Sequence, residues 1–82
     1  MTEQNGDVRA LVEQIAKALV DAPEEVSVDQ ADGETTVFTL KVAASDLGKI
    51  LGRQGRVARA IRSLVNAAGM RAHRRFALEI LE

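Results

Sequence analysis

Apolar residues recur at helical spacing near the start of the chain. The first stripe follows Asn5-Gly6-Asp7, whose residue types favour a helix start. It consists of Val8, Leu11, Val12, Ile15 and Leu19. Because proline disfavours helical backbone at the residue before it, Pro23 should stop this helix. The pattern therefore predicts an amphipathic helix that ends near Asp21.

Strict alternation of apolar and polar residues predicts three strands. The first two are separated by Asp32-Gly33, a pair typical of a two-residue hairpin turn. The inward-facing residues of this hairpin are Val26 and Val28, then Thr36, Phe38, Leu40 and Val42. A third alternating run begins much later, where Phe76, Leu78 and Ile80 share one face. The sequence therefore predicts a hairpin joined by a distant third strand.

Two further helices are expected between the hairpin and the last strand. Ser45 or Asp46 is placed to cap a short helix that ends at Gly52. After Gly55 a longer helix follows, and Gly69 is placed to end it. Its apolar stripe is Val57, Ile61, Leu64, Val65 and Ala68. The predicted fold class is α+β, with three helices on one face of a three-stranded sheet.

Length and composition restrict the function classes. A chain of 82 residues forms one domain, which we expect over residues 7–82 with a flexible tail at 1–6. The absence of Cys and the single His exclude disulfides and most zinc or iron sites, so no metal and no cofactor is expected. No apolar run approaches the roughly 18 residues of a membrane span. The polar, acidic start differs from a signal peptide, which predicts a cytoplasmic protein.

Charge is divided sharply between the two halves of the chain. Residues 1–46 hold ten acidic and three basic residues, a net charge of −7. Residues 47–82 hold eight basic and two acidic residues, a net charge of +6. No acidic residue interrupts the bases between Lys49 and Arg75, and seven of the eight are arginine. Such a concentration of planar bidentate donors is typical of a nucleic-acid site, against the alternative of a merely solvated helix face.

The Gly52-x-x-Gly55 segment lies inside this basic half. Glycine has no Cβ, so a phosphate can approach the backbone closely. The start of the following helix adds a positive dipole end, Arg53 adds a charge, and Gln54 can hydrogen-bond phosphate or sugar. The candidate nucleic-acid-binding residues are Lys49, Gly52, Arg53, Gln54, Gly55, Arg56, Arg59 and Arg62. Three more basic residues are candidates for additional contacts on the far side of a groove, namely Arg71, Arg74 and Arg75.

The stretch from Gly48 to Ile61, with its GxxG between an apolar segment and a basic helix, resembles the signature of the KH family. The element order resembles the bacterial type II form of that family, over roughly Val8 to Leu81. The resemblance implies a GxxG loop that clamps about four nucleotides of single-stranded RNA. It also implies a base groove, for which the candidates are Leu47, Ile50 and Leu51. Ala58 stands where many members have a bulky aliphatic residue, which predicts a shallower pocket.

A stand-alone bacterial KH domain of this size further implies an RNA chaperone. The same resemblance implies a homodimer, a larger KH-containing partner protein, and a role in cell elongation and cell-wall homeostasis.

Other classes fit the sequence less well. An RRM or OB-type reader needs exposed aromatic residues, whereas Phe38 and Phe76 have the spacing of core residues. Neither a P-loop nor a GxGxxG motif is present, and no catalytic set of residues emerges, so no enzyme is expected. A helix-turn-helix DNA binder would leave the strands unexplained. The main alternative is a protein-interaction or dimerisation adaptor whose basic face docks an acidic partner.

Overall fold

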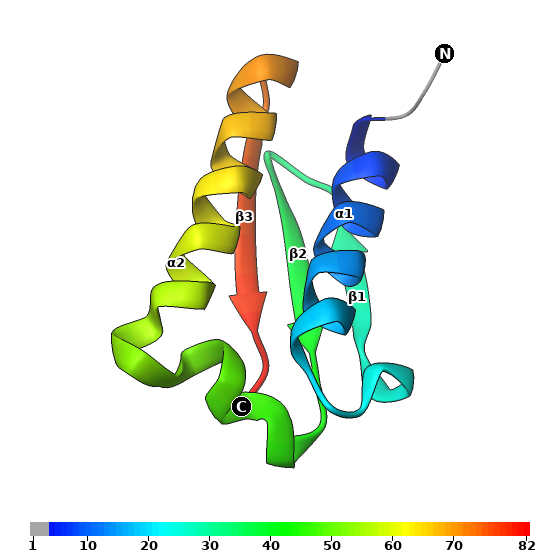
Figure 1. Cartoon of the computed structure of the whole chain (residues 1–82). Helices are drawn as coiled ribbons and strands as arrows, with labels where there is room; N and C mark the ends of the chain where they lie inside the picture. The colour runs from blue at the N-terminus through cyan, green and yellow to red at the C-terminus, as the bar shows by residue number, and fades with distance from the viewer. Residues whose placement is uncertain (1–3) are drawn as a thin grey trace.

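Seven elements follow one another along residues 4–82, the part of the chain that the computed structural model describes, with side chains from Asp7 onward. They are α1 (Gln4–Leu19), the 3₁₀ helix η1 (Pro23–Glu25), β1 (Ser27–Ala31), β2 (Thr35–Lys41), the 3₁₀ helix η2 (Ala44–Asp46), α2 (Leu47–Ala72) and β3 (Arg75–Ile80). Figure 1 shows their arrangement. The predicted α+β class, the hairpin and the distant third strand are confirmed.

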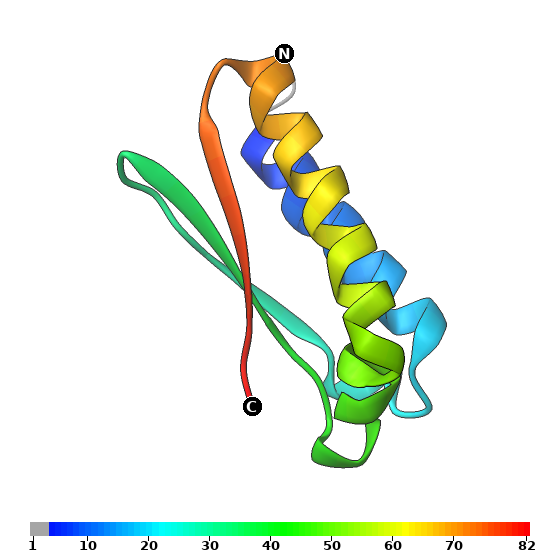
Figure 2. The same cartoon turned by 90° about the vertical axis from the view of Figure 1, so that its left-hand side faces the viewer.

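The three strands form one sheet in the order β1-β2-β3. β1 pairs antiparallel with β2, whereas β3 pairs parallel with β2, from Thr35↔Arg75 to Leu40↔Ile80. A parallel pair needs a crossover connection, and α2 provides it by running the length of the sheet. Both helices cover the same face of the sheet (Figure 2). The start of α2 and the start of β3 therefore lie at opposite ends of the molecule (Figure 1).

The core lies between this sheet face and the two helices. Phe38 and Phe76 from neighbouring strands meet edge to face, with ring centroids 5.4 Å apart at 81°. This is a favoured aromatic geometry, and both rings are buried as predicted. The helices contribute Val8, Val12, Ala16, Ile50, Ala58, Ile61 and Val65.

The predicted apolar stripes of the helices face the sheet, but they include residues that are not buried. Leu11, Leu19 and Leu64 were placed on the buried stripes, yet they are 48%, 43% and 50% exposed. Ala16 and Ala58 are instead buried. The reason is steric, because small residues at the centre of each helix face let the helix approach the sheet closely while the leucines lie at its margins.

The end of α2 differs from the prediction that Gly69 terminates the helix. The helix continues to Ala72, and His73 adopts a left-handed conformation at φ 57°. Its N–H donates to the Met70 carbonyl, and the Arg74 N–H donates to the Gly69 carbonyl at 2.8 Å. These two bonds close the helix end as in a Schellman motif. Gly69 has another role, since a Cβ there would lie 2.8 Å from the Arg74 carbonyl oxygen.

Two other boundaries also differ. Helix α1 begins at Gln4, so Asn5-Gly6-Asp7 lies in its first turn and does not precede it. Of the predicted tail 1–6, residues 4–6 are thus helical, and residues 1–3 lie outside the described residues. The residues described contain two α-helices where three were predicted, because the expected second and third form the single element α2. That element has a kink of non-helical backbone at Gly52–Gly55.

Replacing Gly69 by alanine should destabilise the fold by about 1–3 kcal/mol, because the new methyl group would overlap the backbone of Arg74 and the Phe76 ring. Urea unfolding measures the change. Gly48→Ala is the matched control, since its Cβ would meet open space within the same helix, and it should stabilise slightly. Equal stability of the two variants would contradict close helix–strand packing at Gly69.

Thr36 offers a second test of the core. Its hydroxyl oxygen is fully buried and has no hydrogen-bond partner among the residues the structure describes. Thr36→Val keeps the shape and removes the unsatisfied group, so it should stabilise the protein by about 1 kcal/mol. Thr39→Val, on the opposite face of the same strand, should change the free energy of unfolding by less than about 0.5 kcal/mol. A loss of stability in Thr36→Val would show that the hydroxyl is satisfied.

Candidate nucleic-acid interface

The kink in α2 is an exposed corner with left-handed backbone. Gly52 is extended, at φ −70° and ψ 176°. Arg53, Gln54 and Gly55 then follow with φ of 54°, 63° and 71°. Left-handed geometry costs a non-glycine residue about 1–2 kcal/mol, so two consecutive residues with side chains hold appreciable strain here. Arg53 and Gln54 are both exposed, and the corner projects at the lower left of Figure 1.

The two glycines of the corner have different structural requirements. Gly55 has a positive φ, which favours glycine for conformational reasons. Gly52 has an ordinary φ, and a Cβ there would have no neighbour within 4 Å. Within the described part of the chain, the fold therefore gives no reason for glycine at position 52. Because Gly52 has no side chain and the fold does not require glycine there, its backbone is suited to the close approach of another molecule.

Arginines of α2 brace the corner and its surroundings. The Arg59 Nη2 donates a hydrogen bond to the Gln54 carbonyl oxygen at 3.0 Å, which ties the left-handed turn to the following helix. The Arg62 Nε donates to the Leu78 carbonyl oxygen of β3 at 3.4 Å. Both residues were predicted only as RNA contacts. The structure adds that they position the loop and hold α2 against the sheet edge.

The open cations of this end are Arg53 and Arg56. With Gln54 they line a shallow hollow of about 220 Å³. Neither arginine has an ion-pair or hydrogen-bond partner within the described residues. The right-handed segment 56–72 starts directly after Gly55, so its positive dipole end adds to the potential at the loop. An anion placed here meets two free guanidinium groups and a helix start.

Lys49 and Asp46 secure the base of the same corner. The Lys49 Nζ lies 3.4 Å from an Asp21 carboxylate oxygen, so this predicted RNA contact already has an acidic partner. Asp46 was predicted as a helix cap, but its side chain makes no capping hydrogen bond. The buried carboxylate instead accepts from the backbone N–H groups of Asp21 and Ala22 at 3.1 and 3.0 Å. It thereby holds the end of α1 against the start of α2.

The predicted base groove needs correction at Ile50. This side chain is completely buried in the core and offers no surface to a base. Leu47 and Leu51 are half-buried, packed against the core, and retain partial exposure. Ala58 is 1% exposed, so its methyl group faces the sheet. Only the two leucines remain candidates for contact with a base.

Arg71, Arg74 and Arg75 do not close a groove at the loop, because they lie at the other end of α2. The segment 56–72 corresponds to roughly 25 Å of helical rise. Arg74 and Arg75 share a hollow with Glu34, Met70 and His73. Arg71 lines a different hollow with Asp7, Val8 and Ala68, on the side of α1. The structure thus divides the predicted basic set into separate groups.

No group of three His, Asp or Glu residues in the described part of the chain is arranged to hold a metal ion. No helix in residues 4–82 is long and apolar enough to cross a membrane.

A kinked helix with Gly-x-x-Gly at the kink, packed with a second helix on one face of a three-stranded sheet, defines the chain as a KH domain. Residues 9–80 match the family model described as KhpA/KhpB, KH domain. The chain belongs to this family, as the resemblance in the sequence predicts.

Curated relatives agree over nearly the whole length. The chain is 46% identical over 81 residues to the RNA-binding protein KhpA of Borreliella burgdorferi, covering 98% of this chain and 99% of the relative. It is 49% identical over 72 residues to KhpA of Caldanaerobacter subterraneus, covering 87% and 96%. The KhpA of Clostridium acetobutylicum is 45% identical over 75 residues, covering 90% and 100%. No solved structure gives a significant match.

The two glycines of the kink should respond differently to alanine. Gly55→Ala should cost about 1–2 kcal/mol of stability, because alanine must adopt a left-handed conformation. Gly52→Ala should leave stability unchanged or slightly higher, since its backbone is ordinary and the site is open. Thermal or urea unfolding of both variants checks this. If Gly52→Ala were the more destabilising, the geometry of the corner would be wrong.

Proposed function

We propose that this protein binds single-stranded RNA and holds its sugar–phosphate backbone at Gly52–Gly55. The observation that carries the proposal is the bare backbone of Gly52, which lies between the charged corner and the core without a structural need for glycine. Arg53 and Arg56 supply free bidentate donors for phosphate, and Gln54 supplies an amide. The RNA-binding protein KhpA relatives support the same ligand class.

The loop is suited to gripping a backbone and less suited to reading bases. Phosphate contacts fix a strand in place without carrying sequence information. Leu47 and Leu51 offer limited apolar area, and both phenylalanines of the chain are buried, so the described residues at the loop provide no aromatic ring on which a base could stack. Binding should therefore be broad in sequence, which suits an RNA chaperone. The function is one of binding, without catalysis.

For the wider biological setting, the proposal is supported only by the resemblance to the family. The proposal includes type II KH topology, a homodimer, a KhpB-type partner protein, a cytoplasmic location, and RNA-level regulation that affects cell elongation and cell-wall homeostasis. The alternative is an adaptor whose basic face docks an acidic protein. A salt titration of RNA binding distinguishes the two functions. The logarithm of the binding constant for RNA should fall linearly with the logarithm of the salt concentration, with a slope of about −0.7 for each phosphate contacted.

Two variants test the RNA grip. Arg53→Asp with Gln54→Asp places two carboxylates where phosphate would lie, and aspartate tolerates the left-handed backbone, so the fold should persist. RNA binding, measured by fluorescence anisotropy with a labelled tetranucleotide and a 12-nucleotide strand, should be abolished. Gly52→Ala should lower the affinity for the tetranucleotide by roughly tenfold, equivalent to about 1.4 kcal/mol of binding free energy.

Gly48→Ala is the matched control for the second variant, because it adds the same methyl group four residues earlier on the same element. Its affinity for RNA should equal that of the wild type. Normal RNA binding by a folded Arg53→Asp/Gln54→Asp protein would overturn the assignment of the loop.

A further inference from the structure

The free cations of this protein gather at opposite ends. Five of the eleven lysines and arginines have a partner: Arg9 and Lys17 pair with Glu13, Lys49 pairs with Asp21, and Arg59 and Arg62 donate to backbone carbonyls. The other six have none within the described part of the chain, and they are Lys41, Arg53, Arg56, Arg71, Arg74 and Arg75. Three of these six lie far from the loop: Arg71 is in the last turn of α2, and Arg74 and Arg75 follow the helix.

Backbone geometry holds the far end in place. The left-handed His73 reverses the chain, and the hydrogen bonds to the Gly69 and Met70 carbonyls at 2.8 and 3.2 Å fix the reversal. Arg75 is the first residue of β3 and pairs with Thr35. Arg74 therefore lies in a hydrogen-bonded turn, and Arg75 lies in a paired strand.

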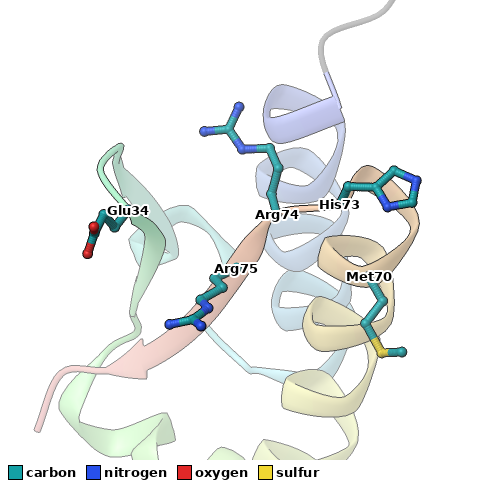
Figure 3. Close-up of a pocket in the computed structure, with 5 residues that line it drawn as sticks. All are labelled: Glu34, Met70, His73, Arg74 and Arg75. Carbon is teal, nitrogen blue, oxygen red and sulfur yellow. The ribbon is translucent and has the colours of Figure 1, made fainter.

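The hollow at this end is larger than the one at the loop. It is an open depression of about 550 Å³, against about 220 Å³ for the one beside Arg53. Figure 3 shows Arg75 projecting from the start of β3 and Arg74, from the turn before it, pointing in a different direction, while Met70 projects from the last turns of α2 and His73 from the residue that follows the helix. Glu34 lies across the hollow, and its carboxylate points away from Arg74 (Figure 3). Met70 is 77% exposed and adds an apolar surface.

A polar flank of α2 links the two ends. Arg59, Arg62 and Asn66 follow one another at intervals of three and four residues, so they lie on one side of the helix. All three are exposed, and the Arg62 bond to Leu78 places this side along β3. No acidic residue lies on segment 56–72. A polyanion held at the kink can therefore follow this flank towards Arg74.

We propose that Arg74 and Arg75, with His73, form a second contact for the backbone of the same RNA strand, beyond the nucleotides held at the loop. This inference rests on the proposed function. Guanidinium planes bind phosphate bidentately and also stack on bases, and Met70 gives a base an apolar surface. Protein partners are usually anchored by exposed Tyr, Trp or Phe side chains, and the described residues expose none of these three types here.

The test compares two RNA lengths. A tetranucleotide fills only the loop site, whereas a 12-nucleotide strand is long enough to continue along α2. Arg74→Gln with Arg75→Gln should leave the tetranucleotide affinity unchanged. For the 12-nucleotide strand, the same variant should lower the salt slope by roughly 1.4 and the affinity by roughly twentyfold at 0.1 M salt, if each arginine contacts one phosphate.

Charge-matched controls distinguish a direct contact with RNA from a general effect of the protein's positive charge on RNA binding. Arg71→Gln with Lys17→Gln also removes two positive charges, but Arg71 lines the separate hollow beside Asp7. This control should change the affinity for either RNA by less than about twofold. Glu34→Gln should act in the opposite direction, raising affinity for the 12-nucleotide strand alone, because it removes a repulsive carboxylate from the hollow.

Equal binding of the 12-nucleotide strand by wild type and Arg74→Gln/Arg75→Gln would overturn the second contact, as would an equal loss in the charge-matched control. Failure of the proposed function would give a different result from failure of the second contact. In that case the wild type would bind no tetranucleotide, or the Gly52→Ala variant would bind it normally. Selective loss of the longer RNA supports the second contact alone.

Discussion

Left-handed backbone at three consecutive residues is the constraint on which the whole candidate site depends. Arg53 and Gln54 gain nothing locally from this geometry, which costs about 1–2 kcal/mol for each. The turn persists because both sides of it are anchored: Ile50 and Ala58 are buried to 0% and 1% exposure, and Arg59 holds the Gln54 carbonyl. Core packing therefore offsets the conformational strain of an exposed corner that the loop sequence would not adopt alone. A loop held in this way loses little conformational freedom when a ligand binds.

Topology explains how a chain with a net charge of −1 can present a basic surface. Because β3 pairs parallel with β2, α2 must run the full length of the sheet, and it distributes the basic half of the sequence between both ends. Several acidic residues of the first half are engaged elsewhere: Glu13 pairs within α1, Asp21 pairs with Lys49, and Asp46 is buried against backbone N–H groups. The free arginines of α2 thus have no acidic residue on their own helix. Local charge, and not the total, governs attraction of a polyanion.

Periodicity was sufficient to predict the strands, the hairpin turn at Asp32-Gly33 and the direction of each helix face, because burial on one side imposes these patterns directly. It could not predict which residues lie at the margin of a face, so Leu11 and Leu64 were placed in the core while Ala58 was expected at a pocket. It also misplaced the end of α2, since His73 is an unusual residue for a left-handed cap and Gly69 is needed for packing. The GxxG corner was found because its glycines are visible in sequence. The bond from Arg59 to Gln54 depends on three-dimensional placement and has no sequence signal. The separation of Arg53 from Arg74, by contrast, follows from the length of the helix between them, which the sequence predicts.

Amide chemical-shift mapping during titration with a tetranucleotide RNA tests whether an RNA backbone lies against the kink of α2, because every backbone N–H around the corner reports separately on the ligand. We expect the largest shifts at residues 52–56, and we expect them to saturate together, with β1 and the uncovered face of the sheet nearly unchanged. Saturable shifts confined to β1 or to the uncovered sheet face, with residues 52–56 unmoved, would contradict this placement of the RNA.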